Sequence, residues 1–163
     1  MNTQGRRKRM GYTQYWYREK IIDQTNYNKI IADFKKIRES LFNHGVLLAG
    51  QKGDGIPVLT DSQIIFNGSA ESRGSAEPFR FDREIQFDNM RPRKTAANGT
   101  IFQRTKTEGL AYDLAVTAFL VIAKHYLDGH INVNSDGHSE DWNGARELCQ
   151  QILGYGNDFK LDK

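Results

Sequence analysis

The feature that most constrains the fold is a helix-length segment that is apolar almost all the way round. From Leu110 to Leu127 the sequence reads LAYDLAVTAFLVIAKHYL, and its aliphatic and aromatic side chains cover most of a helix circumference. Its longest apolar run, Leu114 to Ala123, is interrupted by Thr117 and is about half the length that a membrane span needs. We therefore expect a central helix buried in a protein core, and no contact with a membrane.

Two further helices are predicted on either side of this segment. The first begins at Asp23 or Thr25, either of which can cap it, and runs to about Asn43 with one apolar stripe at spacings of three and four. The other is capped by Ser139 and ends at Gly154, a residue suited to the left-handed backbone that closes a helix.

Short segments rich in β-branched and aromatic residues predict about five strands. They lie at residues 11–18, 62–67, 100–107 and 131–134, with one or two more within 79–87. An Asn-Gly turn is expected to end the second of them, at Asn67 and Gly68. Strands clustered between helices indicate a single α+β domain over residues 10–156, a mixed or antiparallel sheet packed with three helices, the second of them buried. A polar tail is expected over residues 157–163.

The positive charge of the chain is concentrated at its beginning. The 163 residues carry a net charge of +3, but residues 1–9 hold Arg6, Arg7, Lys8 and Arg9 and no acid. Without them the chain has one more acidic than basic residue. We expect a disordered basic leader that makes weak, salt-sensitive contacts with nucleic acid, and a body without the basic excess typical of DNA-binding domains.

The best candidate site combines a basic strand with the start of the buried helix. Arg104 and Lys106 alternate with threonines and should project from one face of a strand. Tyr112 and Asp113 fall in the first turn of the helix that follows, where backbone N–H groups favour anions. Together these four residues predict a pocket for a phosphate-bearing ligand. The alternative is an ion pair from Lys106 or Arg104 to Asp113, with Tyr112 packed in the core.

A second candidate is the aromatic strand near the N-terminus. Tyr12, Tyr15, Trp16 and Tyr17 offer flat faces on which a base can stack. Core packing is the alternative reading, above all for Trp16. Because both faces of this strand carry aromatic side chains, we expect both faces to be covered.

The turn Ser135-Asp136-Gly137-His138 supplies the third candidate. A carboxylate beside a histidine can activate water, although Asp-Gly also makes an ordinary turn. His125 and His130 lie nearby, but the spacing fits no zinc motif, and we expect neither a metal nor a cofactor. His125, on the apolar helix, is expected to be a core residue.

One segment carries a specific resemblance. The stretch from Met10, MGYTQYWYR, resembles the opening of a family of small proteins of tailed bacteriophages and prophages, in which histidine commonly stands where this chain has Gln14. The resemblance continues through residues 65–68, 105–107, 112–113, 135–137, 141–142, 145–149 and 154–156. It implies a phage origin and a usual start at Met10, and it brings no established activity. If the family's histidine does acid–base chemistry, this chain lacks that group.

These patterns leave three functions open. The first is a non-catalytic phage protein that binds a nucleotide-like or other anionic small molecule in the cytoplasm of the infected cell, sequestering a signal of host defence. A homo-oligomer is expected for such a protein. The second is a phosphodiesterase or nuclease that uses Asp113 or Asp136 with His138. The third is a nucleic-acid-binding accessory protein that uses the basic leader and residues 91–94. The expected ligand-binding residues are Tyr12, Tyr15, Trp16, Asn67, Arg104, Lys106, Tyr112, Asp113, Ser135 and Asp136.

Overall fold

A computed structural model describes residues 8–86 and 95–162 of the chain. Most of the predicted basic leader and the basic loop at 91–94 lie outside these residues. Lys8 and Arg9, at the end of the leader, are described and are attached to the body. Lys8 forms an ion pair with Glu108, and Arg9 pairs with Asp141 at 3.2 Å while its guanidinium lies over the ring of Tyr12.

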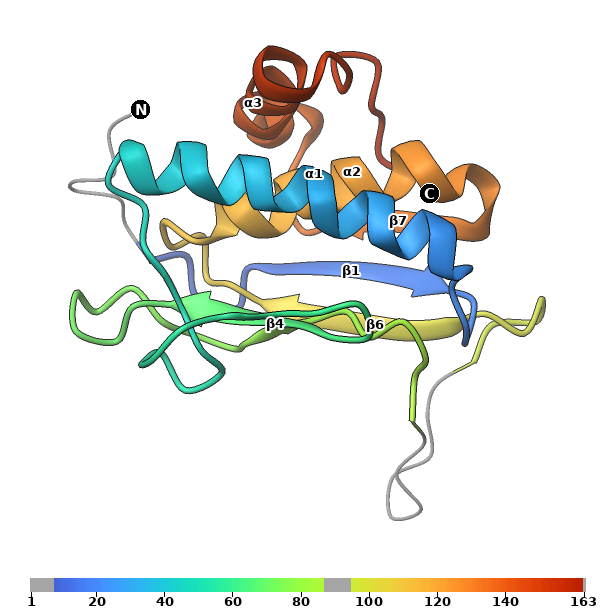
Figure 1. The fold of residues 1–163 in the computed structure, drawn as a ribbon, viewed down its shortest axis with the longest axis horizontal. Helices are drawn as coiled ribbons and strands as arrows, with labels where there is room; N and C mark the ends of the chain where they lie inside the picture. The colour runs from blue at the N-terminus through green and yellow to red at the C-terminus, as the bar shows by residue number, and fades with distance from the viewer. Residues whose placement is uncertain (1–7, 87–94, 163) are drawn as a thin grey trace.

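The described residues form an α+β fold in which helices pack on one side of a layer of strands (Figure 1). The strands are β1 (Thr13–Arg18), β2 (Leu48–Ala49), β3 (Val58–Leu59), β4 (Ile64–Gly68), β5 (Phe79–Arg80), β6 (Ile101–Lys106) and β7 (Ile131–Ser135). The α-helices are α1 (Gln24–Asn43), α2 (Asp113–Leu127) and α3 (Asn143–Leu153). The predicted fold class is confirmed, with seven strands over these residues where about five were expected.

Two antiparallel sheets share the strand layer. One has the order β6-β1-β7, so the N-terminal strand lies at its centre. The other has the order β2-β4-β3, with β5 also paired to β4. Glu77 joins the two sheets just before β5, because its backbone N–H donates to the Lys106 carbonyl and its carboxylate accepts the Lys106 N–H at 2.8 Å.

The helices begin and end largely where their sequences predict. Asp23 caps α1 by accepting the N–H of Asn26, and Gly45 follows the helix with a positive φ of 86°. Gly154 closes α3 in the left-handed region. The predicted cap at Ser139 is wrong, because residues 139–142 form a short 3₁₀ turn and α3 starts only at Asn143.

The core lies between α2 and the strand layer. Phe119 of α2 has no exposed surface, and its ring packs against those of Phe34, Phe79 and Phe81. Trp16, on the helix side of β1, is also buried, as the core reading of that residue predicts. No helix of the described residues is long and apolar enough to cross a membrane.

Three local expectations are corrected by the packing. Asn67 and Gly68 do not form a turn but are the last two residues of β4. The tail beyond Gly156 packs on the body, since Phe159 is buried and stacks on Trp142 at 5.0 Å. His125 is exposed rather than part of the core, and its ring stacks on Tyr155 at 3.6 Å.

Candidate functional site

The register of β6, β1 and β7 sorts their side chains between two faces of the sheet. Tyr15 is paired with Arg104 of β6 and with Asn134 of β7, while Tyr17 is paired with Phe102 and Asn132. Residues directly opposite one another project to the same side. These side chains therefore share the side that faces away from the helices, and Figure 1 shows α1 and α2 on the opposite side. We call this side of β6-β1-β7 the outer face.

The outer face combines aromatic rings with cations. The Phe102 ring lies 5.3 Å from that of Tyr17 and 6.3 Å from that of Tyr15, and all three are partly exposed. Arg104, also on this face, is exposed, and its side chain has no hydrogen bond or ion pair with another residue in the described ranges. Over the described residues, the helices cover only the Trp16 side of the aromatic strand, so the expectation that both faces are covered is not met there.

A polar cavity lies between β5 and β6 next to Arg104. Its volume is about 360 Å³, and the residues that line it are Pro78, Arg80, Asp82, Ile85, Gln86, Gln103 and Arg104. We call it the Arg80–Arg104 groove. Arg80 donates from Nε and Nη2 to one oxygen of Asp82, at 3.0 and 2.9 Å, and its side chain remains about half exposed. Two guanidinium groups at one cavity favour an anionic ligand.

Asp82 is the buried acidic group of this groove. The residue is 8 % exposed, and while Oδ2 accepts both bonds from Arg80, Oδ1 is buried and has no hydrogen-bond partner among the described residues. A buried carboxylate oxygen without a donor is costly, and such groups in folded proteins call for an explanation. The groove thus offers cations for an anion, while Asp82 Oδ1 lies buried behind its surface.

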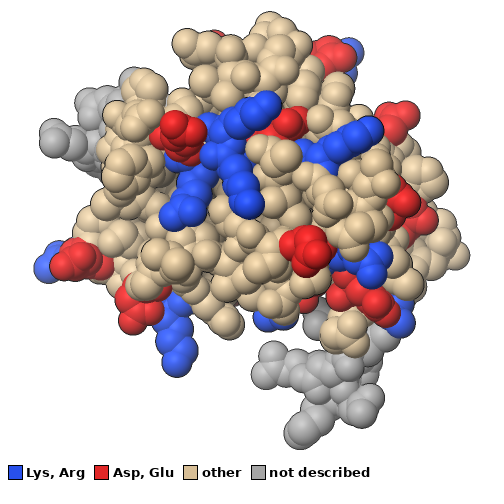
Figure 2. Space-filling view, viewed as in Figure 1, with Lys and Arg blue, Asp and Glu red and all other residues tan. Residues whose placement is uncertain are grey.

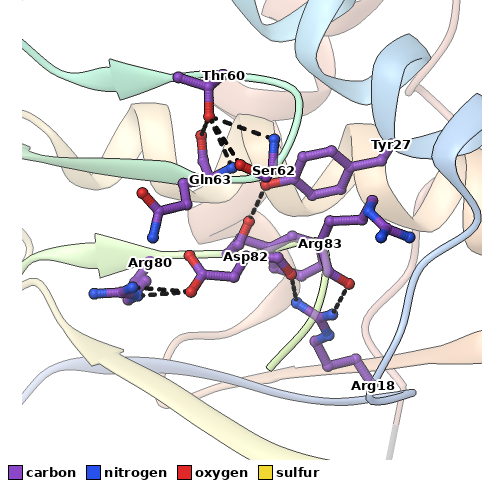
Figure 3. A network of polar contacts seen from close by, with 9 residues as sticks. Arg18, Tyr27, Thr60, Ser62, Gln63, Arg80, Asp82 and Arg83 are labelled. Atoms are coloured by element: carbon purple, nitrogen blue, oxygen red, sulfur yellow. Dashed lines mark hydrogen bonds and ion pairs between the residues drawn. The ribbon is translucent and has the colours of Figure 1, made fainter. Parts of the chain in front are cut away.

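A buried arginine fixes the segment that carries Asp82. The Arg18 guanidinium, at the end of β1, donates to the carbonyls of Asp82 and Arg83, as Figure 3 shows, and to those of Glu19 and Lys20. It also lies 4.4 Å from the centre of the Phe81 ring. Burial lowers the pKa of Arg18 to about 10.

Tyr27 of α1 holds the same segment from the helix side. Its hydroxyl donates to the Phe81 carbonyl, and burial raises the pKa of Tyr27 above its usual range (Figure 3). The neighbouring turn is closed by Thr60, whose hydroxyl accepts the N–H of Gln63 at 3.0 Å. The strand of β5 and the residues after it are therefore held from two sides, so the groove has a fixed wall.

The structure does not bring the four residues of the predicted phosphate pocket together. Arg104 and Lys106 project from the outer face, whereas Thr105 and Thr107 point toward α2 and are buried. The Asp113 carboxylate accepts from the Thr107 hydroxyl and from Gln14 Nε2, at 2.5 and 3.0 Å. Neither predicted cation forms an ion pair with Asp113, so the alternative reading is not observed either over the described residues.

Four of the predicted ligand-binding residues, including Tyr112, are buried. Tyr12, Trp16, Asn67 and Tyr112 are each less than 10 % exposed. The Trp16 indole donates to Gln103, and the Asn67 amide ties β4 to the loops at Gln51 and Ala76. The Tyr112 hydroxyl donates to the carbonyl of Glu77. These side chains shape the fold around the site but present little surface to a ligand.

Asp136 holds the edge of the outer face. It accepts the Thr13 N–H at 3.1 Å and a short bond from the Tyr15 hydroxyl, which raises the pKa of that tyrosine to about 12. The Ser135 hydroxyl accepts the N–H of Gly137 within the same turn. His138 is exposed, and no hydrogen bond joins its ring to Asp136 in the part of the chain that the structure describes. Asp136 thus orients Tyr15 as part of the aromatic surface.

We also looked for a metal site among the described residues and for similar proteins. Among the described residues, no three His, Cys, Asp or Glu side chains are placed to hold a metal ion together. A scan against protein-family models, a search of curated proteins and a search of solved structures each found no match.

The groove contains residues that the sequence did not single out. Arg80 is the last residue of β5, Asp82 lies in the irregular stretch that follows it, and Gln103 was predicted only as part of a strand. The sequence FRFDR at residues 79–83 could have indicated the groove. Its two phenylalanines favour burial, and Arg80, Asp82 and Arg83 beside them are therefore placed next to the core.

Proposed function

We propose that this protein binds a nucleotide-like anionic small molecule, without chemically changing it, at the Arg80–Arg104 groove and the adjoining outer face. The observation that carries the proposal is the position of Arg104. It lines the groove and is also the cross-strand partner of Tyr15, so it joins a cationic cavity to an aromatic surface. Phosphate and a flat heterocyclic base are the two chemical groups that such a combination suits.

The dimensions support a small ligand. A volume of about 360 Å³ falls at the lower end of cavities that hold cofactors and similar molecules. The phosphate would bind at Arg80 and Arg104. A base extending onto the outer face would stack on Tyr15, Tyr17 or Phe102.

The proposal is for binding because the candidate catalytic groups already have structural roles. Asp113 is buried under Gln14 and Thr107, and Asp136 is occupied by the Thr13 N–H and the Tyr15 hydroxyl. A general base must be within reach of the proton that it removes, and neither carboxylate faces the groove. In the phage setting implied by the resemblance, such a protein would sequester a nucleotide signal of host defence in the cytoplasm of the infected cell.

Calorimetric titration with a panel of mononucleotides, dinucleotides and cyclic dinucleotides tests the proposal. Arg104→Ala should weaken the best ligand by about 10- to 100-fold, the value of one charge-assisted hydrogen bond of about 1.5–3 kcal/mol. Lys29→Ala, which removes an exposed cation on α1, is the matched control and should leave the affinity unchanged. Mass spectrometry of the released ligand should recover it intact.

Two results would contradict the proposal. One is that no member of the panel binds at about 1 mM, the weak limit of specific recognition. The other is equal affinity of the Arg104 and Lys29 variants. Recovery of a hydrolysed ligand would instead favour the phosphodiesterase.

A further inference from the structure

Large exposed apolar side chains gather at one end of α1. Over the described residues, six large hydrophobic side chains are exposed, and three of them belong to this region: Phe42 (65 %), Leu47 (53 %) and Ile56 (80 %). Single exposed apolar residues are ordinary, but a contiguous group marks a surface that another molecule covers.

These side chains border two adjoining cavities of about 420 and 440 Å³ that share Arg38 and Phe42. We call the pair the apolar groove. One wall is α1, and the other is formed by β3 and by the loops at residues 53–56 and 69–71. The Arg80–Arg104 groove shares no lining residue with it.

The wall that carries Ile56 is held in place by the backbone. Gly50 donates to the carbonyl of Asp54 and Gly53 to that of Gly50, both within the loop, while Ala70 donates to the carbonyl of Gly53 from the next loop. Gly53 has a positive φ of 84°, and a Cβ added there would lie 2.8 Å from the Ala70 side chain. A rigid apolar surface loses little entropy when it is covered, so it is suited to binding.

The charges on the two walls are of opposite sign. On α1 the groove is lined by Lys35 and Arg38 with Glu39, and Figure 2 shows the Lys and Arg side chains that gather over this helix. On the loops it is lined by Asp54 and Glu71. A surface that is basic on one side and acidic on the other complements itself when a second copy is rotated by half a turn, because each helix wall then faces the partner's loop wall.

We infer that the apolar groove is the interface of a two-fold homodimer of this chain. The apolar residues Phe42 and Ile56 lie near the dimer axis in this arrangement, and the charged walls flank them. The proposal is independent of the ligand site, since the two grooves have no residue in common.

Sedimentation of the full chain tests the dimer directly. The unaltered protein should sediment as a dimer at about 100 µM, and Phe42→Asp and Ile56→Asp should each shift it to the monomer. Ile152→Asp, which adds the same charge at an exposed apolar residue of α3, is the control and should remain dimeric. Circular dichroism establishes that each variant is folded, and ligand affinity at the other groove should not change.

Exchanging the wall charges gives a sharper test that leaves the apolar residues intact. Lys35→Glu with Arg38→Glu makes both walls acidic, and Asp54→Lys with Glu71→Lys makes both walls basic. Each double variant should repel its own copy and sediment as a monomer, but an equimolar mixture should form the heterodimer, with an affinity at least tenfold above that of either variant for itself.

A monomeric unaltered protein at about 100 µM would overturn the proposal and leave the groove to a different partner or to none. A dimer that survives Phe42→Asp and Ile56→Asp would also overturn it, because the interface then lies elsewhere. Monomers in the mixture of charge variants would refute the two-fold arrangement.

Discussion

Replacing Asp113 with alanine should destabilise the protein far more than removing the nearby cation Lys106. Asp113 is 4 % exposed and lies in the first turn of α2, where its carboxylate accepts from Gln14 Nε2 and from the Thr107 hydroxyl. Asp113→Ala leaves two buried donors unsatisfied, at about 1–3 kcal/mol each. It also removes a favourable charge at the helix N-terminus, worth about 0.3–1 kcal/mol. The expected loss is about 2–7 kcal/mol in the free energy of unfolding.

Urea denaturation followed by circular dichroism measures this loss. With a slope of about 1–3 kcal/mol/M, the midpoint of urea denaturation should fall by about 1 M or more. Asp113→Asn, which keeps one accepting oxygen, should lose about half as much free energy of unfolding. It provides a measurable variant if Asp113→Ala does not fold. Because Gln14→Ala removes one of the two donors, the double variant with Asp113→Ala should be more stable than the sum of the single effects predicts, by about 1–2 kcal/mol.

Lys106→Ala is the control that decides between the two readings of this region. The Lys106 ammonium projects from the outer face, and none of the ion pairs between described residues includes it. Its removal should cost less than about 1 kcal/mol. If Lys106→Ala destabilises the protein as much as Asp113→Ala does, the two residues are buried partners and the described arrangement is wrong.

Three further predictions concern the core, the cysteine and the end of the leader. Phe119→Ala should cost about 3–5 kcal/mol in urea denaturation, and a loss under about 1 kcal/mol would contradict its central position. Burial raises the pKa of the Cys149 thiol to about 12. A thiol reagent at pH 8 should therefore leave Cys149 unmodified in the native protein and modify it fully in denaturant. Rapid labelling of the native protein would show that α3 opens. Arg9→Ala should cost up to about 1 kcal/mol at pH 7 and low salt. The His138 N–H and the Arg9 guanidinium hold the pKa of Asp141 below its usual range, against burial, which raises it. The cost of Arg9→Ala should therefore vanish as the pH falls through that lowered pKa, and a cost that persists in acid would contradict the ion pair.

The sequence predicted the elements well because their signals are local. The stripe of α1 and the apolar circumference of α2 each follow from spacing alone, and both helices form where expected. The prediction that Arg104 and Thr105 project from opposite faces of their strand is also confirmed. What spacing cannot tell is which side of a strand faces the helices, and here the threonine side does.

That one choice explains most of the difference between the predicted and the observed site. The first turn of α2 meets Thr107 and Gln14, so Asp113 is separated from Arg104, while the cations share the outer face with Tyr15. Asp82 was missed for a related reason. It lies in an irregular segment whose position depends on Arg18, 64 residues earlier in the chain, and no local pattern reports such a contact.

The central position of β1 also has a consequence during synthesis. This strand leaves the ribosome well before β6 and β7, its two neighbours in the sheet, and Trp16 bonds to a Gln103 side chain 87 residues further along. At about 5–20 residues per second, roughly 4–17 s pass before β6 exists, and β7 follows later still. During that time an aromatic strand has two unpaired edges, the kind of segment that chaperones bind and that aggregates when they are scarce. Yield in cells should therefore depend on translation speed and chaperone supply more than the stability of the finished fold would suggest.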